Sequence, residues 1–256
     1  MLVGRHIDGP NTLSSLQLAI KQKCAVLQIF VSPMTVTEIR TFVKKKKMLL
    51  FIHSDYSINL ARPIETSKTS LLIKEMRIAD QLKAEGVIIH MGHGTTDNYM
   101  RNISFVLDKT TGIIILENGA GTGMEINTSL SDLLELYRII NNMYPNRVKI
   151  CIDTCHAWAS GHTMVDVYRF CAAVGWDNIA CFHLNDSKGT FGSRIDRHAD
   201  IGFGTIQGLE NLLQSIPNIP LILETPCDTY YRIAGKLTQI DPMDQMELIR
   251  SWLHNI

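Results

Sequence analysis

Residues 179–198 read IACFHLNDSKGTFGSRIDRH, and this stretch shows the pattern on which the whole chain is built. An apolar run of strand length ends in His183 and gives way to a polar, glycine-containing loop. Functional residues concentrate on loops that rigid elements carry. Later in the loop, Asp196 and His198 stand two residues apart, which places both side chains on the same side of an extended segment. The stretch therefore predicts a strand followed by a loop with a functional site.

The same arrangement recurs along the chain. Eight apolar runs of strand length, rich in β-branched residues, occur at 2–7, 25–30, 49–53, 86–90, 112–117, 148–153, 179–183 and 219–224. Segments with helical spacing lie between them, including 66–85, 129–143, 163–174 and 241–253. Nearly continuous apolar strands are typical of a parallel sheet that is covered on both faces. Eight strand–helix repeats predict a closed (β/α)8 TIM barrel of the α/β class.

A doubly wound open sheet is the competing architecture. The glycine-rich stretch GAGTG at 119–123 follows a strand but lacks the GxGxxG spacing of dinucleotide-binding folds, which disfavours this alternative. No shift in composition and no Pro/Ser-rich linker divides the chain. We therefore expect a single domain over residues 1–256.

Composition excludes some classes of protein. The 25 basic residues balance the 25 acidic ones, so the net charge gives no support to broad nucleic-acid binding, although a local basic surface is still allowed. The apolar runs are shorter than the roughly 20 residues that span a bilayer. The first residues do not resemble a secretory signal, and the six cysteines form no CxxC pair. We expect free thiols and an intracellular, reducing compartment rather than secretion.

Six of the eight runs end in a residue of a type that commonly binds metal ions: His53, His90, Glu117, Asp153, His183 and Glu224. The C-terminal ends of barrel strands open on one face, so these side chains should converge there. A lone histidine or carboxylate at a strand end is more often a hydrogen-bonding or capping residue. Six together would be costly through desolvation and repulsion unless cations held them, so a metal site is the better interpretation.

Further candidates extend this set. His156 lies three residues beyond Asp153, far enough to face a different ion, and Asp196 with His198 completes a second cluster. Oxygen and nitrogen donors of this kind suit zinc. Cys151 and Cys155 are expected in the core or behind the ligands rather than on a metal, because nine oxygen and nitrogen donors already suffice.

Five motifs, in this order, resemble those of endonuclease IV, the zinc-dependent apurinic/apyrimidinic endonuclease family of base excision repair, over nearly the whole chain. They are HSDYSINL (53–60), LENGAGTG (116–123), CIDTCHAWASG (151–161), FHLNDSKGTFGSRIDRHADIGFG (182–204) and LILET (221–225). The resemblance implies a (β/α)8 barrel and hydrolysis of the phosphodiester 5′ of an abasic site in duplex DNA. The products would be a 3′-hydroxyl and a 5′-deoxyribose phosphate. A monomer is the default for a protein that enfolds bent DNA.

The resemblance also implies three zinc ions. His53, His90 and Glu117 would bind the first, Glu117, Asp153, His183 and Glu224 the second, and His156, Asp196 and His198 the third. Glu117, Asp153 and Glu224 would be the catalytic carboxylates.

The DNA-handling loops depart from that family. Tyr56 stands where the family has an aromatic residue that helps to fill the gap in the duplex, but Ser57 replaces a large apolar residue. The loop at 31–34 is short and lacks the inserted arginine of the family. Candidate contacts to backbone phosphates are Arg62, Lys188, Arg194, Arg197 and Arg232.

Two other functions stay open. A metal-dependent sugar isomerase or epimerase uses the same barrel with one or two metals, but it has no evident need for a cluster of His156, Asp196 and His198. A protein that binds abasic DNA without cutting it is the non-enzymatic alternative.

Overall fold

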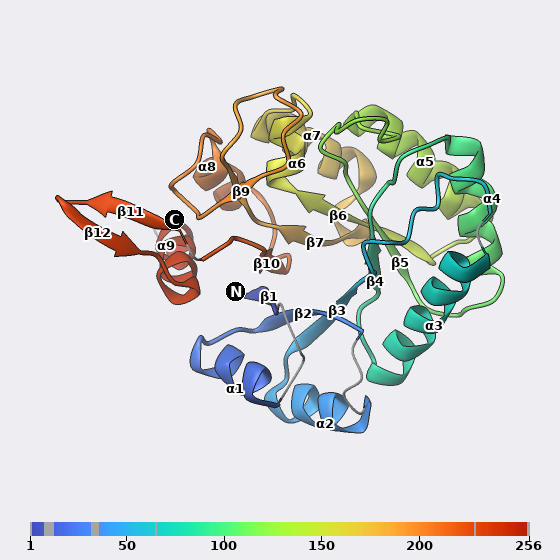
Figure 1. Ribbon diagram of the computed structural model, residues 1–256, viewed down its shortest axis with the longest axis horizontal. Helices are drawn as coiled ribbons and strands as arrows, with labels where there is room; N and C mark the ends of the chain where they lie inside the picture. Colours follow the sequence, from blue (N-terminus) through green and yellow to red (C-terminus); the bar gives the residue numbers. More distant parts are fainter. Residues whose placement is uncertain (1, 8–12, 32–35, 65, 228, 255–256) are drawn as a thin grey trace.

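The first and last strands of the barrel, β1 (Val3–Ile7) and β10 (Leu221–Leu223), pair in parallel and close the sheet. The computed structural model describes residues 2–7, 13–31, 36–64, 66–227 and 229–254. Around the barrel the strand order is β1-β10-β7-β6-β5-β4-β3-β2, all parallel (Figure 1). The predicted (β/α)8 TIM barrel is confirmed.

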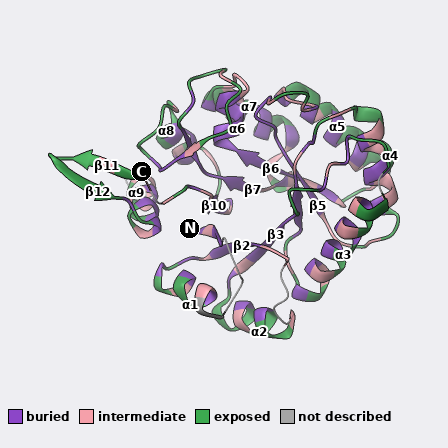
Figure 2. Cartoon of the chain, in the orientation of Figure 1, coloured by how far each residue is buried: buried purple, intermediate pink, exposed green. Residues whose placement is uncertain are grey.

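The eight predicted strands are all present, each within two residues of its expected bounds. The remaining barrel strands are β2 (Val26–Phe30), β3 (Leu49–His53), β4 (Val87–Ile89), β5 (Ile114–Glu117), β6 (Val148–Asp153) and β7 (Ile179–His183). The helices are α1 (Leu13–Lys21), α2 (Val36–Lys46), α3 (Thr66–Leu82), α4 (Thr96–Leu107), α5 (Leu130–Met143), α6 (Thr154–Ala159), α7 (Met164–Val174), α8 (Leu209–Ser215) and α9 (Pro242–His254), with a 3-10 turn η1 (Trp176–Asn178). The longer helices ring the barrel and bury their inner faces against it (Figure 2).

Local signals explain where these helices begin. The Ser129 side chain accepts from Asp132 N at the start of α5, and Thr163 forms a capping box with Asp166 at the start of α7. Such caps satisfy backbone N–H groups that have no partner within the helix. None of the helices in the described ranges combines the length and the apolarity that a bilayer crossing requires.

Inside the barrel, side chains form two successive layers. One layer is an apolar cluster of Val26, Phe51, Ile88, Ile115, Cys151, Cys181 and Ile222, from seven strands. Gly4 completes it on β1, where a Cβ would meet the Val26 carbonyl. Because side chains alternate along a strand, the residue two positions later faces the same way. At those positions stand His6, Gln28, His53, His90, Glu117, Asp153, His183 and Glu224. This second layer, at the C-terminal ends of the strands, carries the candidate site.

Two small sheets were not predicted from the sequence. Strands β8 (Asp186–Ser187) and β9 (His198–Ala199) pair within the loop that follows β7. Strands β11 (Tyr230–Ile233) and β12 (Lys236–Gln239) form a hairpin that projects from the barrel (Figure 1). Its two-residue turn has positive φ at Ala234 (48°) and Gly235 (81°), as a type I′ turn requires.

Candidate metal centre

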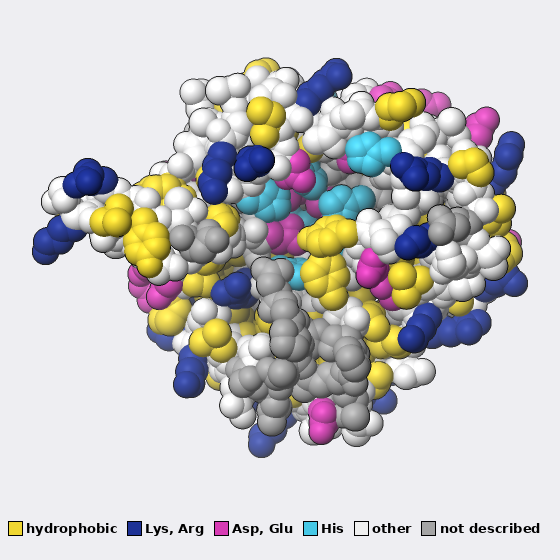
Figure 3. All heavy atoms as spheres, in the orientation of Figure 1, with side chains coloured by type: hydrophobic (Ala, Val, Ile, Leu, Met, Phe, Trp, Pro, Cys, Tyr) yellow, Lys and Arg dark blue, Asp and Glu magenta, His cyan; other side chains and the backbone are white. Residues whose placement is uncertain are grey.

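The nine predicted ligands lie together at the C-terminal mouth of the barrel. They form three groups in which the ligand atoms are within 4.8 Å of one another: His53, His90 and Glu117; Glu117, Asp153, His183 and Glu224; and His156, Asp196 and His198. Figure 3 shows histidines and carboxylates gathered in a hollow of this face. Residues that lie far apart in the sequence therefore meet here, as expected for barrel strand ends.

In the first group, two imidazoles face one carboxylate oxygen. His53 Nε2 lies 3.5 Å and His90 Nε2 lies 3.6 Å from Glu117 Oε2. These separations are long for hydrogen bonds, but two ligands of one tetrahedral zinc ion, each about 2.0–2.1 Å from it, stand roughly 3.4 Å apart. The other ring nitrogen of His53, Nδ1, contacts the Ser54 carbonyl at 2.8 Å.

The second group uses the other oxygen of Glu117. His183 Nδ1 lies 3.0 Å from Glu117 Oε1, 3.2 Å from Glu224 Oε2 and 4.0 Å from Asp153 Oδ2. Because Glu117 turns one oxygen to each group, it can bridge two ions. Asp153 Oδ1 is engaged elsewhere, since it accepts from His156 N at the start of α6.

The third group joins α6 to the loop after β7. His156 Nε2 lies 3.3 Å from Asp196 Oδ2, and His198 Nε2 lies 3.4 Å from Asp196 Oδ1. His156 Nδ1 contacts the Asn118 carbonyl at 2.9 Å, and His198 Nδ1 contacts the Glu224 carbonyl at 3.1 Å. Backbone carbonyls thus take the Nδ1 hydrogens, which leaves both Nε2 atoms turned toward Asp196.

Two buried atoms show that these residues fit a cation. Glu117 Oε2 and His198 Nε2 are buried and have no hydrogen-bond partner in the described part of the chain. A buried polar atom without a partner is costly. Imidazole nitrogens and carboxylate oxygens at such positions suit a divalent ion of the zinc type.

Without an ion, charge within the site shifts the titration of its histidines. Burial alone would lower the pKa of His183, but the carboxylates of Glu224 and Glu117 outweigh it and raise the pKa to about 10. Burial alone would also lower the pKa of His198, but Asp153 and Asp196 outweigh it and raise the pKa to about 9. Burial dominates at His90 and lowers its pKa to about 4. The carboxylates therefore form a strongly cation-attracting surface.

Sequence reasoning missed Asn118 and Gln28. Asn118 holds both backbone groups of Asp153 through its side-chain amide. Gln28, fully buried on β2, contacts Glu224, His183 and His6. An amide is not a typical zinc ligand, so residue type drew no attention to either position.

Asp186, in the loop that the sequence marked as a site, has a structural role. Its carboxylate accepts from four backbone N–H groups, those of Ser187, Gly202, Gly204 and Ile206, at 2.8–3.2 Å. These bonds fold the segment after β9 back onto the loop. Asp186 is therefore occupied and stands apart from the three groups.

The cysteines are free thiols. Cys151 and Cys155 are fully buried, as expected for core residues. Burial raises the pKa of Cys151 above its usual range and that of Cys155 to about 12. Both cysteines also lie near ligand-type residues, Cys151 beside Cys181 and His183, and Cys155 beside Asp153 and His198.

The predicted DNA contacts are exposed. Tyr56 is 69% exposed, and its ring lies 5.2 Å from that of His53 and 5.7 Å from that of His90. The basic candidates Arg62, Lys188, Arg194, Arg197 and Arg232 are exposed as well. Figure 3 shows basic side chains around the hollow. Residues 32–34 of the short loop lie outside the described residues.

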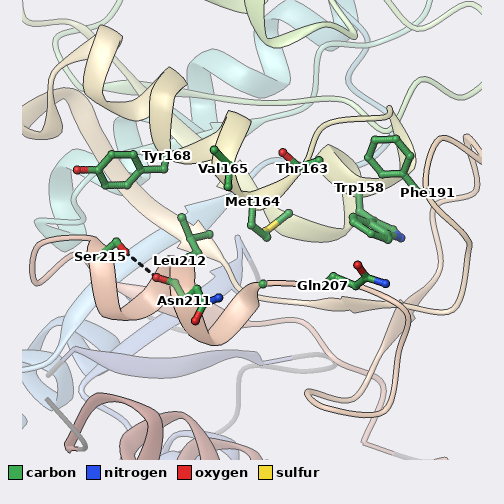
Figure 4. A pocket seen from close by; sticks show the side chains of 11 residues that line it. Trp158, Thr163, Met164, Val165, Tyr168, Phe191, Gln207, Asn211, Leu212 and Ser215 are labelled. Atoms are coloured by element: carbon green, nitrogen blue, oxygen red, sulfur yellow. Dashed lines mark hydrogen bonds between the residues drawn. The ribbon is translucent and has the colours of Figure 1, made fainter.

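An apolar pocket of about 870 Å³ lies beside the loop that carries Asp196 (Figure 4). Trp158, Met164 and Leu212 line it together with Phe191, whose ring lies 4.9 Å from that of Trp158. None of the nine predicted ligands lines this pocket. The contact between Trp158 of α6 and Phe191 of the loop holds the loop against that helix.

Comparisons with known proteins place the chain among barrels of this kind. Residues 22–255 match the family described as xylose isomerase-like TIM barrel. An endonuclease 4 of Acanthamoeba polyphaga mimivirus is 32% identical over 98% of this chain and 93% of its own length. The endonuclease 4 of Trichlorobacter lovleyi is 32% identical over 88% of this chain and 92% of its own length.

Solved structures show the same fold. Endonuclease IV from Thermus thermophilus superposes with a TM-score of 0.82 at 24% identity, covering 100% of both chains. A D-tagatose 3-epimerase-like protein superposes with a TM-score of 0.75 at 17% identity, covering 100% of this chain and 98% of its own. The barrel alone therefore does not separate a nuclease from a sugar epimerase.

Proposed function

The chain belongs to the endonuclease IV family of xylose isomerase-like TIM barrels, and we propose from this that it hydrolyses duplex DNA at abasic sites. The bond cut would be the phosphodiester 5′ of the abasic nucleotide, in base excision repair. Water would add to phosphorus, the P–O3′ bond would break and the leaving 3′ oxygen would take a proton, so that the products are a 3′-hydroxyl and a 5′-deoxyribose phosphate. The observation that carries the proposal is the presence of three ligand groups at one mouth.

We propose that each group holds one zinc ion, with the nine ligands as described above. Divalent ions in such a site lower the pKa of bound water and neutralise charge on a phosphate. Glu117, Asp153 and Glu224 would act by holding and spacing these ions. With ions bound, these three carboxylates and that of Asp196 would be paired with positive charge and would no longer repel the phosphate.

Residues at the rim would handle the duplex. The exposed cations Arg62, Lys188, Arg194 and Arg197 can contact backbone phosphates, which position DNA without reading its sequence. Tyr56 presents its ring over the site and can fill space where a base is missing. An abasic nucleotide has lost its pairing, so extruding it costs less than extruding a normal one. Selectivity then follows without base contacts.

The third group distinguishes this reaction from sugar isomerisation. Moving a proton along a sugar needs one or two ions, whereas cutting a phosphodiester benefits from stabilising both entering and leaving oxygens. His156, Asp196 and His198 supply that additional place for a cation. Three zinc ions per chain by elemental analysis would favour the nuclease.

The direct test is incision of a duplex that carries one tetrahydrofuran abasic analogue. Wild type should cut it on the 5′ side and leave an end that a polymerase extends without trimming. Glu117→Gln and Asp196→Ala should lose incision while remaining folded. Glu135→Gln, at an exposed position of α5, should cut like the wild type. Zinc-loaded wild type that makes no cut would refute the assignment, and retention of the duplex without scission would point to a binding protein.

A further inference from the structure

Among the eight side chains of the layer that closes the barrel mouth, Gln28 is the neutral amide. It is fully buried and makes three hydrogen-bonding contacts with neighbours in that layer. Its Nε2 lies 2.6 Å from Glu224 Oε1 and 2.8 Å from His6 Nδ1, and its Oε1 lies 2.7 Å from His183 Nε2. Both hydrogens and the oxygen of the amide are thus in use.

The orientation of this amide follows from its partners. A carboxylate oxygen only accepts hydrogen bonds, so the group that faces Glu224 at 2.6 Å must be the NH2 of Gln28. The amide oxygen then faces His183. Because an amide oxygen only accepts, the hydrogen of the facing His183 nitrogen must reside on Nε2.

This arrangement makes His183 different from the other oriented histidines. In His53, His156 and His198, Nδ1 contacts a backbone carbonyl and Nε2 faces the carboxylates. In His183 the roles are exchanged, since Nε2 contacts Gln28 and Nδ1 faces Glu117 and Glu224. A side chain, rather than the backbone, therefore decides which nitrogen of His183 is presented.

Glu224 is oriented by the same amide. Its Oε1 accepts from Gln28, while its Oε2 lies 3.2 Å from His183 Nδ1. One oxygen is thereby held away from the second group and the other is turned into it. Partners behind metal ligands commonly fix tautomer and orientation in this way.

We propose that Gln28 is a positioning residue of the second ligand group. It keeps the hydrogen of His183 on Nε2 and occupies one oxygen of Glu224, so that His183 Nδ1 and Glu224 Oε2 are the atoms presented to an ion. His6 Nδ1 accepts the second amide hydrogen of Gln28 and so holds the amide in this orientation. The inference rests on the metal centre of the proposed function.

The first test uses the wild type alone. In zinc-loaded protein labelled with 15N histidine, long-range 1H–15N correlation should show the His183 hydrogen on Nε2 and a metal-shifted Nδ1. His53, His156 and His198 should show the opposite assignment. A His183 hydrogen on Nδ1 would overturn the proposal without any variant.

The second test compares zinc affinities by chelator competition. Gln28→Met keeps the volume but removes the amide that donates to Glu224 and His6 and accepts from His183. It should weaken the zinc affinity of one of the three sites by roughly 10- to 100-fold. Gln245→Met is the matched control, because Gln245 is also a buried glutamine with three partners, Ile201 N, Asp200 Oδ1 and Cys227 Sγ. It should leave all three affinities unchanged.

These outcomes separate the inference from the function on which it rests. Unchanged affinities in Gln28→Met, or equal weakening by Gln245→Met, would overturn the positioning role even if the wild type cuts abasic DNA. Selective weakening in a wild-type protein that binds zinc but does not cut would support the positioning role while the nuclease assignment fails.

Discussion

The side-chain amide of Asn118 hydrogen-bonds both backbone groups of Asp153, donating to its carbonyl at 3.1 Å and accepting from its N–H at 2.7 Å. Asn118 directly follows β5, and Asp153 ends β6. The side chain therefore continues the pairing of the two strands beyond Glu117 and Cys151, their last paired residues. This link fastens the backbone of Asp153 to the end of β5, next to Glu117.

Replacing Asn118 with Ala should loosen that link. Two buried backbone groups of Asp153 would lose their partners, so the free energy of unfolding should fall by about 2–4 kcal/mol in urea titrations. Zinc affinity should fall as well. Asn102→Ala is the control, since the buried Asn102 amide bonds the carbonyls of Leu60 and Arg62 instead. It should lower stability without changing zinc affinity, and a like effect of both variants on zinc would contradict the prediction.

A buried carboxyl outside the metal centre should make stability depend on pH. Glu75 on α3 is 3% exposed, and burial raises its pKa from 4.5 to about 7. The folded state thus keeps a proton that the unfolded chain releases above about pH 4.5, so stability falls as pH rises from there to about 7. Glu75→Gln should remove this loss. Relative to the wild type, its free energy of unfolding should therefore rise with pH by up to about 3 kcal/mol between pH 4.5 and 7.

The measurement is the free energy of unfolding at several pH values between 4.5 and 8. Glu135→Gln, at an exposed position of α5, serves as the control and should track the wild type. A constant difference between Glu75→Gln and wild type at all pH values would show that the carboxyl of Glu75 does not titrate in this window.

Tyr56 should contribute to DNA binding but not to metal binding. Its ring is mostly exposed above His53 and His90, and it belongs to none of the three ligand groups. Tyr56→Ala should weaken binding of an abasic duplex by about 1–3 kcal/mol, the usual contribution of an aromatic platform. Fluorescence anisotropy in a Glu117→Gln background avoids cutting. Tyr168→Ala, on α7, should bind like the parent, and zinc loss in Tyr56→Ala would refute the assigned role.

The aromatic pair of Trp158 and Phe191 should stabilise the third ligand group. Phe191 belongs to the loop that carries Asp196, and the loop backbone also bonds α6 through Gly192 N to the Trp158 carbonyl at 3.0 Å. Phe191→Ala removes a contact of about 1 kcal/mol, so one of three zinc ions should bind roughly fivefold more weakly. Phe203→Ala, which removes a contact with Tyr231, is the comparison. Loss of two or more ions would show a wider effect than this contact explains.

The barrel was predictable because each strand carries its own signal. Apolar runs of strand length separated by helical segments specify the repeat, and a ligand-type residue at the end of a run identifies the mouth. Gln28 gave no such signal, because it lies within the run 25–30 rather than at its end. Only the structure shows that it stands two residues after Val26, as His53 stands two residues after Phe51, and so belongs to the same layer.

Other features depended on contacts that spacing does not show. Asp186 and Asp196 lie in one loop, and only the backbone N–H groups around Asp186 distinguish a fold-organising carboxylate from a candidate ligand. The β11–β12 hairpin turns at Ala234, which adopts a positive φ that alanine rarely takes. The zinc ions and their ligands remain a prediction that the geometry supports.

Pairing between Val3 and Leu221 has a consequence for biosynthesis. β10 leaves the ribosome long after β1, and at about 5–20 residues per second the interval is on the order of 10–40 s. Until β10 emerges, Glu224 cannot join the other donors and the edge of β1 lacks its neighbour. A nascent chain would therefore lack the complete second ligand group, and the edge of β1 would stay unpaired until β10 is synthesised.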